Sequence, residues 1–114
     1  MRLQWLVLLV LVLMVSTSAT KQLIVSGWNP INIYEPYMYE IGNFAVTEYD
    51  KQTGSKLKFE KIFKAESMVV EWIDYRLILS ANDGSHSKTY KAVVWETTER
   101  DAKNLTSFAP IVNY

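Results

Sequence analysis

Side chains that perform covalent or metal chemistry are scarce in this chain of 114 residues. Cysteine is absent, so no thiol is available as a nucleophile or a zinc ligand. His86 is the one histidine, and the polar stretch around it offers no second histidine to share a metal ion. Four carboxylates whose spacing matches neither a glycosidase pair nor a calcium loop are expected to be solvated surface acids: Glu71, Asp74, Glu96 and Glu99. The residues therefore predict no catalytic site, no bound metal and no cofactor.

The balance of charge argues against polyanionic partners. The chain has 12 lysine and arginine residues and 12 aspartate and glutamate residues, which gives a formal net charge of zero. Nucleic acids are bound through a basic stripe, and anionic membrane surfaces attract basic segments. We therefore expect neither a nucleic acid nor a membrane surface as a partner.

The first nineteen residues have the pattern of a secretory signal peptide. Arg2 is followed by an almost wholly apolar run over 3–15 and by small residues over 16–19. The apolar run is shorter than the roughly 20 residues that span a membrane. We expect a signal peptide over 1–19 and a secreted, extracellular domain over 20–114 without membrane attachment; an uncleaved anchor is the alternative. Without disulfides, this domain depends on its core and its sheet.

The element that must organise the domain is a helix over residues 36–54. Pro36 suits the first helical position, and Gly54 suits a left-handed residue just past the end. Gly42 lies inside the apolar stripe, where its expected use is the close approach of a strand backbone. The stripe has spacings of three and four residues and comprises Tyr37, Ile41, Phe44, Ala45 and Tyr49. One face of the helix therefore requires a partner surface.

Alternation of apolar and polar residues predicts strands on both sides of this helix. A short first strand over 21–28 is expected to end at Ser26-Gly27 and to be broken by Asn29-Pro30. A phase slip around residues 62–63 predicts a bulge. Four later strands are expected over 57–63, 75–81, 90–95 and 105–108, with a short apolar run over 67–70 before the second of them, a turn over 82–85, a loop over 97–103, and Pro110 closing an edge strand. The pattern predicts an α+β fold, in which one helix packs across a curved antiparallel sheet of about four to five strands.

At this point the chain resembles the plant cystatins, small inhibitors of papain-like cysteine proteases. The helix segment 41–50 is similar to the signature of the plant branch. Further similar segments follow in the expected order at 57–61, 75–77, 92–96 and 104–108. The resemblance covers most of the expected mature domain. It implies the cystatin fold and papain-like cysteine proteases as partners.

The resemblance also implies a reversible inhibitor that acts as a three-part wedge: an N-terminal trunk and two hairpin loops enter the protease cleft without chemical reaction. The trunk corresponds to Ser26 and Gly27. The first loop corresponds to Met68, Val69, Val70, Glu71 and Trp72, in which Met68 replaces a glutamine and Trp72 a glycine. The second loop corresponds to Thr98 and Glu99, which replace a Pro-Trp pair. These replacements predict weak inhibition, and they leave a non-inhibitory, cystatin-fold interaction protein as the alternative.

Several residues have two interpretations. An aromatic residue in place of a hairpin glycine predicts either backbone strain or a different turn at Trp72. Its ring is either an exposed anchor or the inward-facing start of the next strand, and Met68 either forms a loop tip or continues its strand. Trp28 and Trp95 are expected to pack in the core. Asn104-Leu105-Thr106 is a sequon for N-glycosylation. A monomer is expected, with a dimer formed by exchange of the first hairpin as the alternative.

Overall fold

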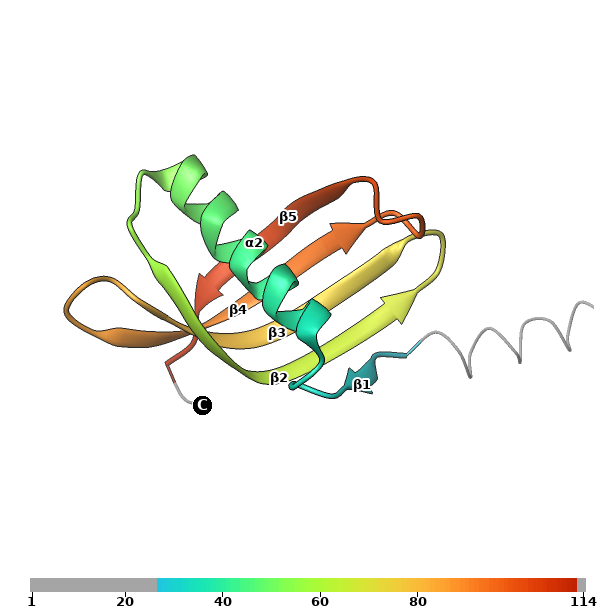
Figure 1. The fold of residues 1–114 in the computed structure, drawn as a ribbon, viewed down its shortest axis with the longest axis horizontal. Helices are drawn as coiled ribbons and strands as arrows, with labels where there is room; N and C mark the ends of the chain where they lie inside the picture. Colours follow the sequence, from blue (N-terminus) through green and yellow to red (C-terminus); the bar gives the residue numbers. More distant parts are fainter. Residues whose placement is uncertain (1–26, 113–114) are drawn as a thin grey trace, which may run out of the picture.

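The computed structural model describes residues 27–112, in which one helix lies across one face of an antiparallel five-stranded sheet (Figure 1). The elements are β1 (Asn29–Ile31), α2 (Pro36–Thr53), β2 (Lys58–Val69), β3 (Ile73–Asn82), β4 (Ser87–Glu96) and β5 (Lys103–Pro110). The strands lie in the sheet in chain order, and each pairs antiparallel with the next. The expected α+β architecture is confirmed. The expected signal peptide over 1–19 and the segment 20–26, with Ser26, lie outside the described residues.

Helix α2 begins and ends where its sequence signals predict. Pro36 occupies the first turn, and Glu35 before it has an extended backbone and makes no side-chain cap. Gly54 has φ of 75°, and its N–H donates to the carbonyl of Asp50 at 2.8 Å. Within residues 27–112, no helix combines the length and the apolar character needed to cross a membrane.

The core lies between α2 and the central strands of the sheet. Ile41 and Ala45 of the predicted stripe are fully buried, but Met38 and Val46 are buried with them, so the stripe is rotated slightly from the predicted one. Tyr37 and Phe44 pack at its margin. The sheet contributes alternate residues of β3 and β4, which point toward the helix as a period of two requires. They are Tyr75, Leu77, Leu79, Ala81, Tyr90, Ala92 and Val94.

Gly42 faces a phenyl ring, which corrects the prediction that a strand backbone passes there. A Cβ atom added to Gly42 would lie 2.8 Å from two ring carbons of Phe59. This is closer than non-bonded carbon atoms pack, because their optimal separation is roughly 3.5 to 4.0 Å. The absent side chain therefore makes room for the ring of Phe59, which also lies edge-on to Tyr39 at 6.0 Å.

A double-mutant cycle tests this contact. Gly42→Ala is expected to destabilise the parent by about 1 kcal/mol, because overpacking exceeds the gain in helix propensity. In a Phe59→Ala background the same substitution is expected to stabilise by about 1 kcal/mol, since the space is then free. Urea unfolding followed by circular dichroism measures both effects. Effects that add without a coupling energy would contradict the contact.

The first described strand lies later in the chain than predicted. Asn29 and Pro30, expected to break the strand, belong to β1, where they pair with Ser67 and Glu66 of β2. The strand is at the edge of the described sheet and is three residues long. Proline is tolerated at a sheet edge because its missing N–H need not join the ladder. The Asn-Pro signal was therefore wrong as a strand breaker.

The predicted bulge and turns are confirmed. Register shifts occur in β2 between Phe59 and Lys61 and between Ile62 and Lys64, where the apolar alternation slips. The turn between β3 and β4 contains Gly84 with φ of 103°. The Asp83 carboxylate accepts from the N–H groups of Ser85 and His86. These hydrogen bonds lower the pKa of Asp83.

Candidate functional site

The three segments that the sequence predicts to act together lie at the same end of the sheet. Figure 1 shows the start of β1, the β2–β3 loop and the β4–β5 loop along one edge. Gly27 is exposed and lies two residues before the start of β1. The register aligns Val69 with Ile73, and Ile73 with Glu96, so both loops leave the sheet at one level. The trunk residue Gly27, the loop residues 68–72 and the pair 98–99 are thus brought together. This end of the sheet is called the loop edge below.

The first loop presents an apolar tip. Val69, the last residue of β2, is 48% exposed, and Val70, which follows it, is 76% exposed. The N–H of Val70 donates to the carbonyl of Trp72 at 3.2 Å, which closes the turn around the exposed Glu71. Met68 is half-buried in β2, so the strand interpretation of Met68 is confirmed. Two neighbouring valines therefore stand free at the loop edge.

The predicted backbone strain is absent from the first loop. Within residues 27–112, Arg100 is the one non-glycine residue with positive φ, at 62°. Residues 70–72 thus adopt a turn that needs no left-handed residue, and the tryptophan in place of glycine is accommodated by this different turn. Of the two alternatives that the sequence predicts at Trp72, the structure therefore has the different turn and not the backbone strain. The left-handed residue lies instead in the second loop.

The tryptophans near the loop edge pack on the surface rather than in the core. The rings of Trp72 and Trp95 are tilted by 60° with centroids 5.8 Å apart. Trp72 is 41% exposed, so it neither turns into the core nor stands free as an anchor. The Arg76 guanidinium lies 4.2 Å from the ring of Trp28 and forms an ion pair with Glu66 at 2.8 Å. The core role expected for Trp28 and Trp95 is therefore wrong.

The second loop is closed by its own hydrogen bonds. Thr97 N–H donates to the carbonyl of Ala102 at 3.1 Å, and Arg100 N–H donates to the carbonyl of Thr97 at 2.9 Å. The hydroxyl of Thr97 donates to the carboxylate of Asp101 and accepts from the N–H groups of Asp101 and Ala102. Thr98 and Glu99 are exposed at the apex. The loop is thus ordered before any partner binds.

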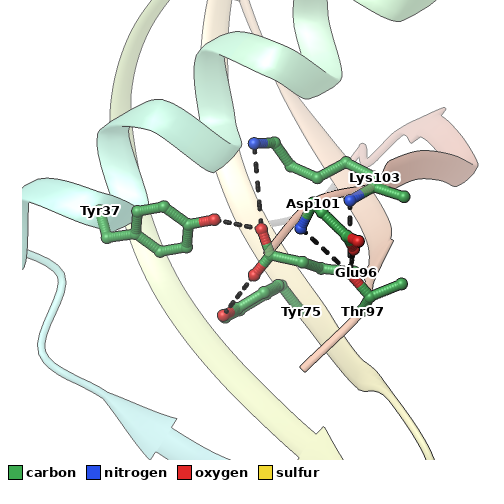
Figure 2. A network of polar contacts seen from close by, with 7 residues as sticks. Tyr37, Tyr75, Glu96, Thr97, Asp101 and Lys103 are labelled. Carbon is green, nitrogen blue, oxygen red and sulfur yellow. Dashed lines mark hydrogen bonds and ion pairs between the residues drawn. The ribbon is translucent and has the colours of Figure 1, made fainter. Parts of the chain in front are cut away.

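A buried carboxylate holds the base of the second loop. Glu96 has no exposed surface, and its two oxygens accept from the hydroxyls of Tyr37 and Tyr75 (Figure 2). The ammonium of Lys103 lies 3.9 Å from the same carboxylate. Burial, the charge of Glu96 and the hydrogen bond to Glu96 raise the pKa of Tyr75 to about 12. Burial, the hydrogen bond to Glu96 and the charge of Glu96 also raise the pKa of Tyr37. Both hydroxyls therefore remain protonated donors at neutral pH.

Glu96 corrects the expectation that the carboxylates of this region are solvated. The alternation of β4 places Glu96 in the same phase as Tyr90, Ala92 and Val94, which all face the core. This period of two was visible in the sequence and is the signal that identifies Glu96 as buried. The other three acids of that set are exposed or half-buried: Glu71, Asp74 and Glu99.

Arg100 links the second loop to the helix. Its guanidinium lies 4.2 Å from the centroid of the Tyr37 ring, a distance at which a cation is attracted to the ring face. Behind the loop edge, an open hollow of about 350 Å³ lies between the start of α2, β1, the facing ends of β2 and β3, and Arg100 of the second loop. Its lining includes Glu35, Tyr37, Val69, Ile73 and Arg100. Helix, sheet and second loop are therefore connected through one cluster of side chains.

Known proteins with similar sequences are protease inhibitors. The model of a family described as aspartic acid proteinase inhibitor matches residues 31–111. Cysteine proteinase inhibitor 5 of Arabidopsis thaliana is 48% identical over 91 residues, which cover 78% of this chain and 75% of that protein. Cysteine proteinase inhibitor 1 of Actinidia chinensis var. chinensis is 34% identical over 92 residues, covering 80% and 79%.

Solved structures with a similar fold include two cystatins from ticks. The salivary cystatin of the soft tick Ornithodoros moubata matches with a TM-score of 0.68 at 17% identity, covering 76% of this chain and 98% of that chain. Mialostatin, a gut cystatin of the hard tick Ixodes ricinus, matches with a TM-score of 0.67 at 9% identity, covering 77% and 100%. At these identities the likeness concerns the fold alone.

Proposed function

Because this chain belongs to the plant cystatin family, a family of protease inhibitors and not of enzymes, we propose that it is a secreted, reversible inhibitor of papain-like cysteine proteases. The observation that carries this proposal is the meeting of three segments at the loop edge, with Val69 and Val70 exposed on the first loop. Exposed valines that gather at one edge supply apolar area for a partner cleft.

The wedge is proposed to bind without reacting. Gly27, residues 68–72 and residues 98–99 enter the cleft together, and affinity comes from the apolar area that is buried and from loops ordered in advance. The hydrogen bonds around Thr97 and the stacking of Arg100 on Tyr37 supply that order in the second loop. No bond of the inhibitor has to break.

The proposed inhibition is weak. Thr98 and Glu99 supply no aromatic anchor, and an anchor tryptophan at the centre of an interface is commonly worth about 2 kcal/mol or more. The carboxylates of Glu71 and Glu99 are exposed and lose solvation if they enter an apolar cleft. Together these features favour a binding constant well above that of a tight inhibitor.

Titration of papain with residues 20–114 tests the proposal. Competitive inhibition is expected, and Val70→Asp is expected to weaken it about thirtyfold or more, because a charge replaces the exposed apolar tip. Val112→Asp is the matched control, since Val112 is also an exposed valine, at 92%, but lies beyond the far end of β5. Equal inhibition by both variants would contradict the proposed loop edge.

The same titration separates the competing functions. The matched family model is described by inhibition of aspartic proteinases, so pepsin is assayed in parallel with papain. Inhibition of pepsin without inhibition of papain would contradict the proposed target and would indicate an inhibitor of aspartic proteinases. A folded parent that inhibits neither protease would favour the non-inhibitory interaction protein.

Secretion is the second part of the proposal. It is supported by the signal-peptide pattern of residues 1–19 in the sequence. Expression of the full chain in plant cells is expected to release a monomer that begins at Thr20. N-terminal sequencing of the secreted protein and its elution volume on a sizing column measure both features. A retained chain that still begins at Met1 would contradict secretion.

A further inference from the structure

The sheet has an aromatic surface that the helix does not cover. Figure 1 shows α2 on one face of the sheet, and the opposite face is called the outer face below. Trp72 and Trp95, here called the tryptophan pair, lie near the loop edge, and Trp95 alternates with the buried Val94 and Glu96, so it belongs to the outer face. Exposed aromatic surface of this kind commonly carries an occupant.

Asn104 lies directly beside Trp95 of the tryptophan pair. In the β4–β5 register, Asn104 is the Cα partner of Trp95. Its neighbour Leu105 packs against the core, so alternation places Asn104 on the outer face with Trp95. Side chains that face each other across antiparallel strands have Cβ atoms about 4.5 to 5.5 Å apart. A group attached to Asn104 therefore starts within contact range of the Trp95 indole.

Asn104 is also accessible to modification. It is exposed, and β5 is an edge strand of the sheet. Residues 104–106 form the sequon Asn-Leu-Thr. Asn104 therefore lies in a sequon, is exposed, and belongs to an edge strand, which are the features that glycosylation of an asparagine requires or favours.

We propose that Asn104 carries an N-linked glycan whose first N-acetylglucosamine packs on the outer-face ring of Trp95. The amide nitrogen of Asn104 forms a bond to C1 of this sugar, which is donated by a lipid-pyrophosphate-linked oligosaccharide. The C1–O bond to the pyrophosphate breaks, the lipid pyrophosphate leaves, and the amide gives up one proton. The inference depends on the proposed secretion, because this donor is met in the secretory pathway, and not on protease inhibition.

The sugar complements the indole surface chemically. The C–H groups on one face of the pyranose ring meet the electron-rich face of an aromatic ring, while its hydroxyls and its acetamide remain in water. The glycan also covers part of the open edge of β5. Free strand edges are sites of unwanted pairing between molecules, and a bulky polar group on the edge prevents it. One modification therefore covers an aromatic patch and an exposed strand.

The test compares three forms secreted from a glycosylating plant cell line. Trimming of the parent with an endoglycosidase that leaves one N-acetylglucosamine is expected to give a Tm about 4 °C above that of Asn104→Gln, with lower quenching of tryptophan fluorescence by acrylamide. Asp83→Asn in the Asn104→Gln background is the matched control. It creates a sequon at 83–85 in the β3–β4 turn, at the other end of these strands. Because the Asp83 carboxylate itself accepts hydrogen bonds in this turn, this double variant is compared with the same double variant produced without glycosylation, and the sugar is expected to change neither quantity.

A second variant separates contact from attachment. Trp95→Thr leaves the sequon 104–106 unchanged, so this variant is expected to retain the sugar, which mass spectrometry detects. It is expected to lose the Tm difference between glycosylated and unglycosylated protein. A secreted chain without sugar at Asn104 would overturn the proposal, as would equal protection of tryptophan by the control sugar at position 83. Papain inhibition is measured separately on Asn104→Gln, where it is expected to be unchanged. Failure of the glycan proposal and failure of the inhibitor proposal are therefore distinguishable.

Discussion

Replacing Thr98-Glu99 by Pro-Trp is expected to tighten inhibition of papain by about thirtyfold or more. The substitution adds an aromatic anchor, commonly worth about 2 kcal/mol or more at the centre of an interface, and removes an exposed carboxylate that must be desolvated on binding. The second loop is ordered by hydrogen bonds from Thr97, Asp101 and Ala102, none of which uses the side chains at 98 or 99. The substitution is therefore expected to leave these hydrogen bonds of the second loop intact. Inhibition constants for parent and variant measure the effect.

Two single variants separate the contributions. Glu99→Gln removes the charge without adding an anchor and is expected to recover a small part of the gain. Thr98→Pro alone tests the loop backbone and is expected to change the inhibition constant less than threefold, because no anchor is added. If the double variant binds no better than the parent while it unfolds at the same urea concentration, the second loop does not contact the protease.

Removal of the Glu96 carboxylate is expected to cost about 3 kcal/mol of unfolding free energy. Glu96→Ala leaves the hydroxyls of Tyr37 and Tyr75 without their acceptor, and unpaired buried polar groups are expensive. Lys103 is partly exposed and regains water, so its contribution is small. Urea unfolding followed by circular dichroism measures the loss.

Variants of neighbouring acids and of the same residue serve as controls. Glu96→Gln retains one acceptor oxygen and is expected to lose roughly half as much. Glu99→Ala removes an exposed acid three positions away and is expected to change stability by less than about 0.5 kcal/mol. A loss below about 1 kcal/mol for Glu96→Ala would mean that the two tyrosines find other partners in the described cluster.

The elements were predictable where one local rule was sufficient. Pro36 and Gly54 bound the helix because proline fixes φ at the first turn and glycine tolerates the left-handed φ just past the last turn, and neither property depends on tertiary contacts. The slip in β2 was visible because a bulge shifts the apolar phase directly. Asn29-Pro30 misled because proline disrupts a central strand but not an edge strand, and the place of a strand in the sheet is not a local property.

The site was harder to predict because its residues act through partners distant in the chain. Glu96 lies 59 residues from Tyr37, and nothing near Glu96 in the sequence announces that contact. Trp28 and Trp95 were assigned to the core by the general preference of tryptophan for burial, whereas the register puts Trp95 on the outer face. For Trp72 the sequence left open backbone strain or a different turn, and the structure has a turn without positive φ. The surroundings of these residues are therefore set by the pairing of the strands and by the type of turn, which local sequence patterns do not specify.

The order of the strands has a kinetic consequence. Three of the four pairings join neighbours through the short connections 70–72, 83–86 and 97–102, so these hairpins close with little loss of chain entropy. The pairing of β1 with β2 has to close a far longer loop, which contains the whole of α2. We expect refolding to assemble both hairpin loops first and to dock Gly27 last. During refolding, the molecule therefore passes through a state in which two of its three contact segments are already in place.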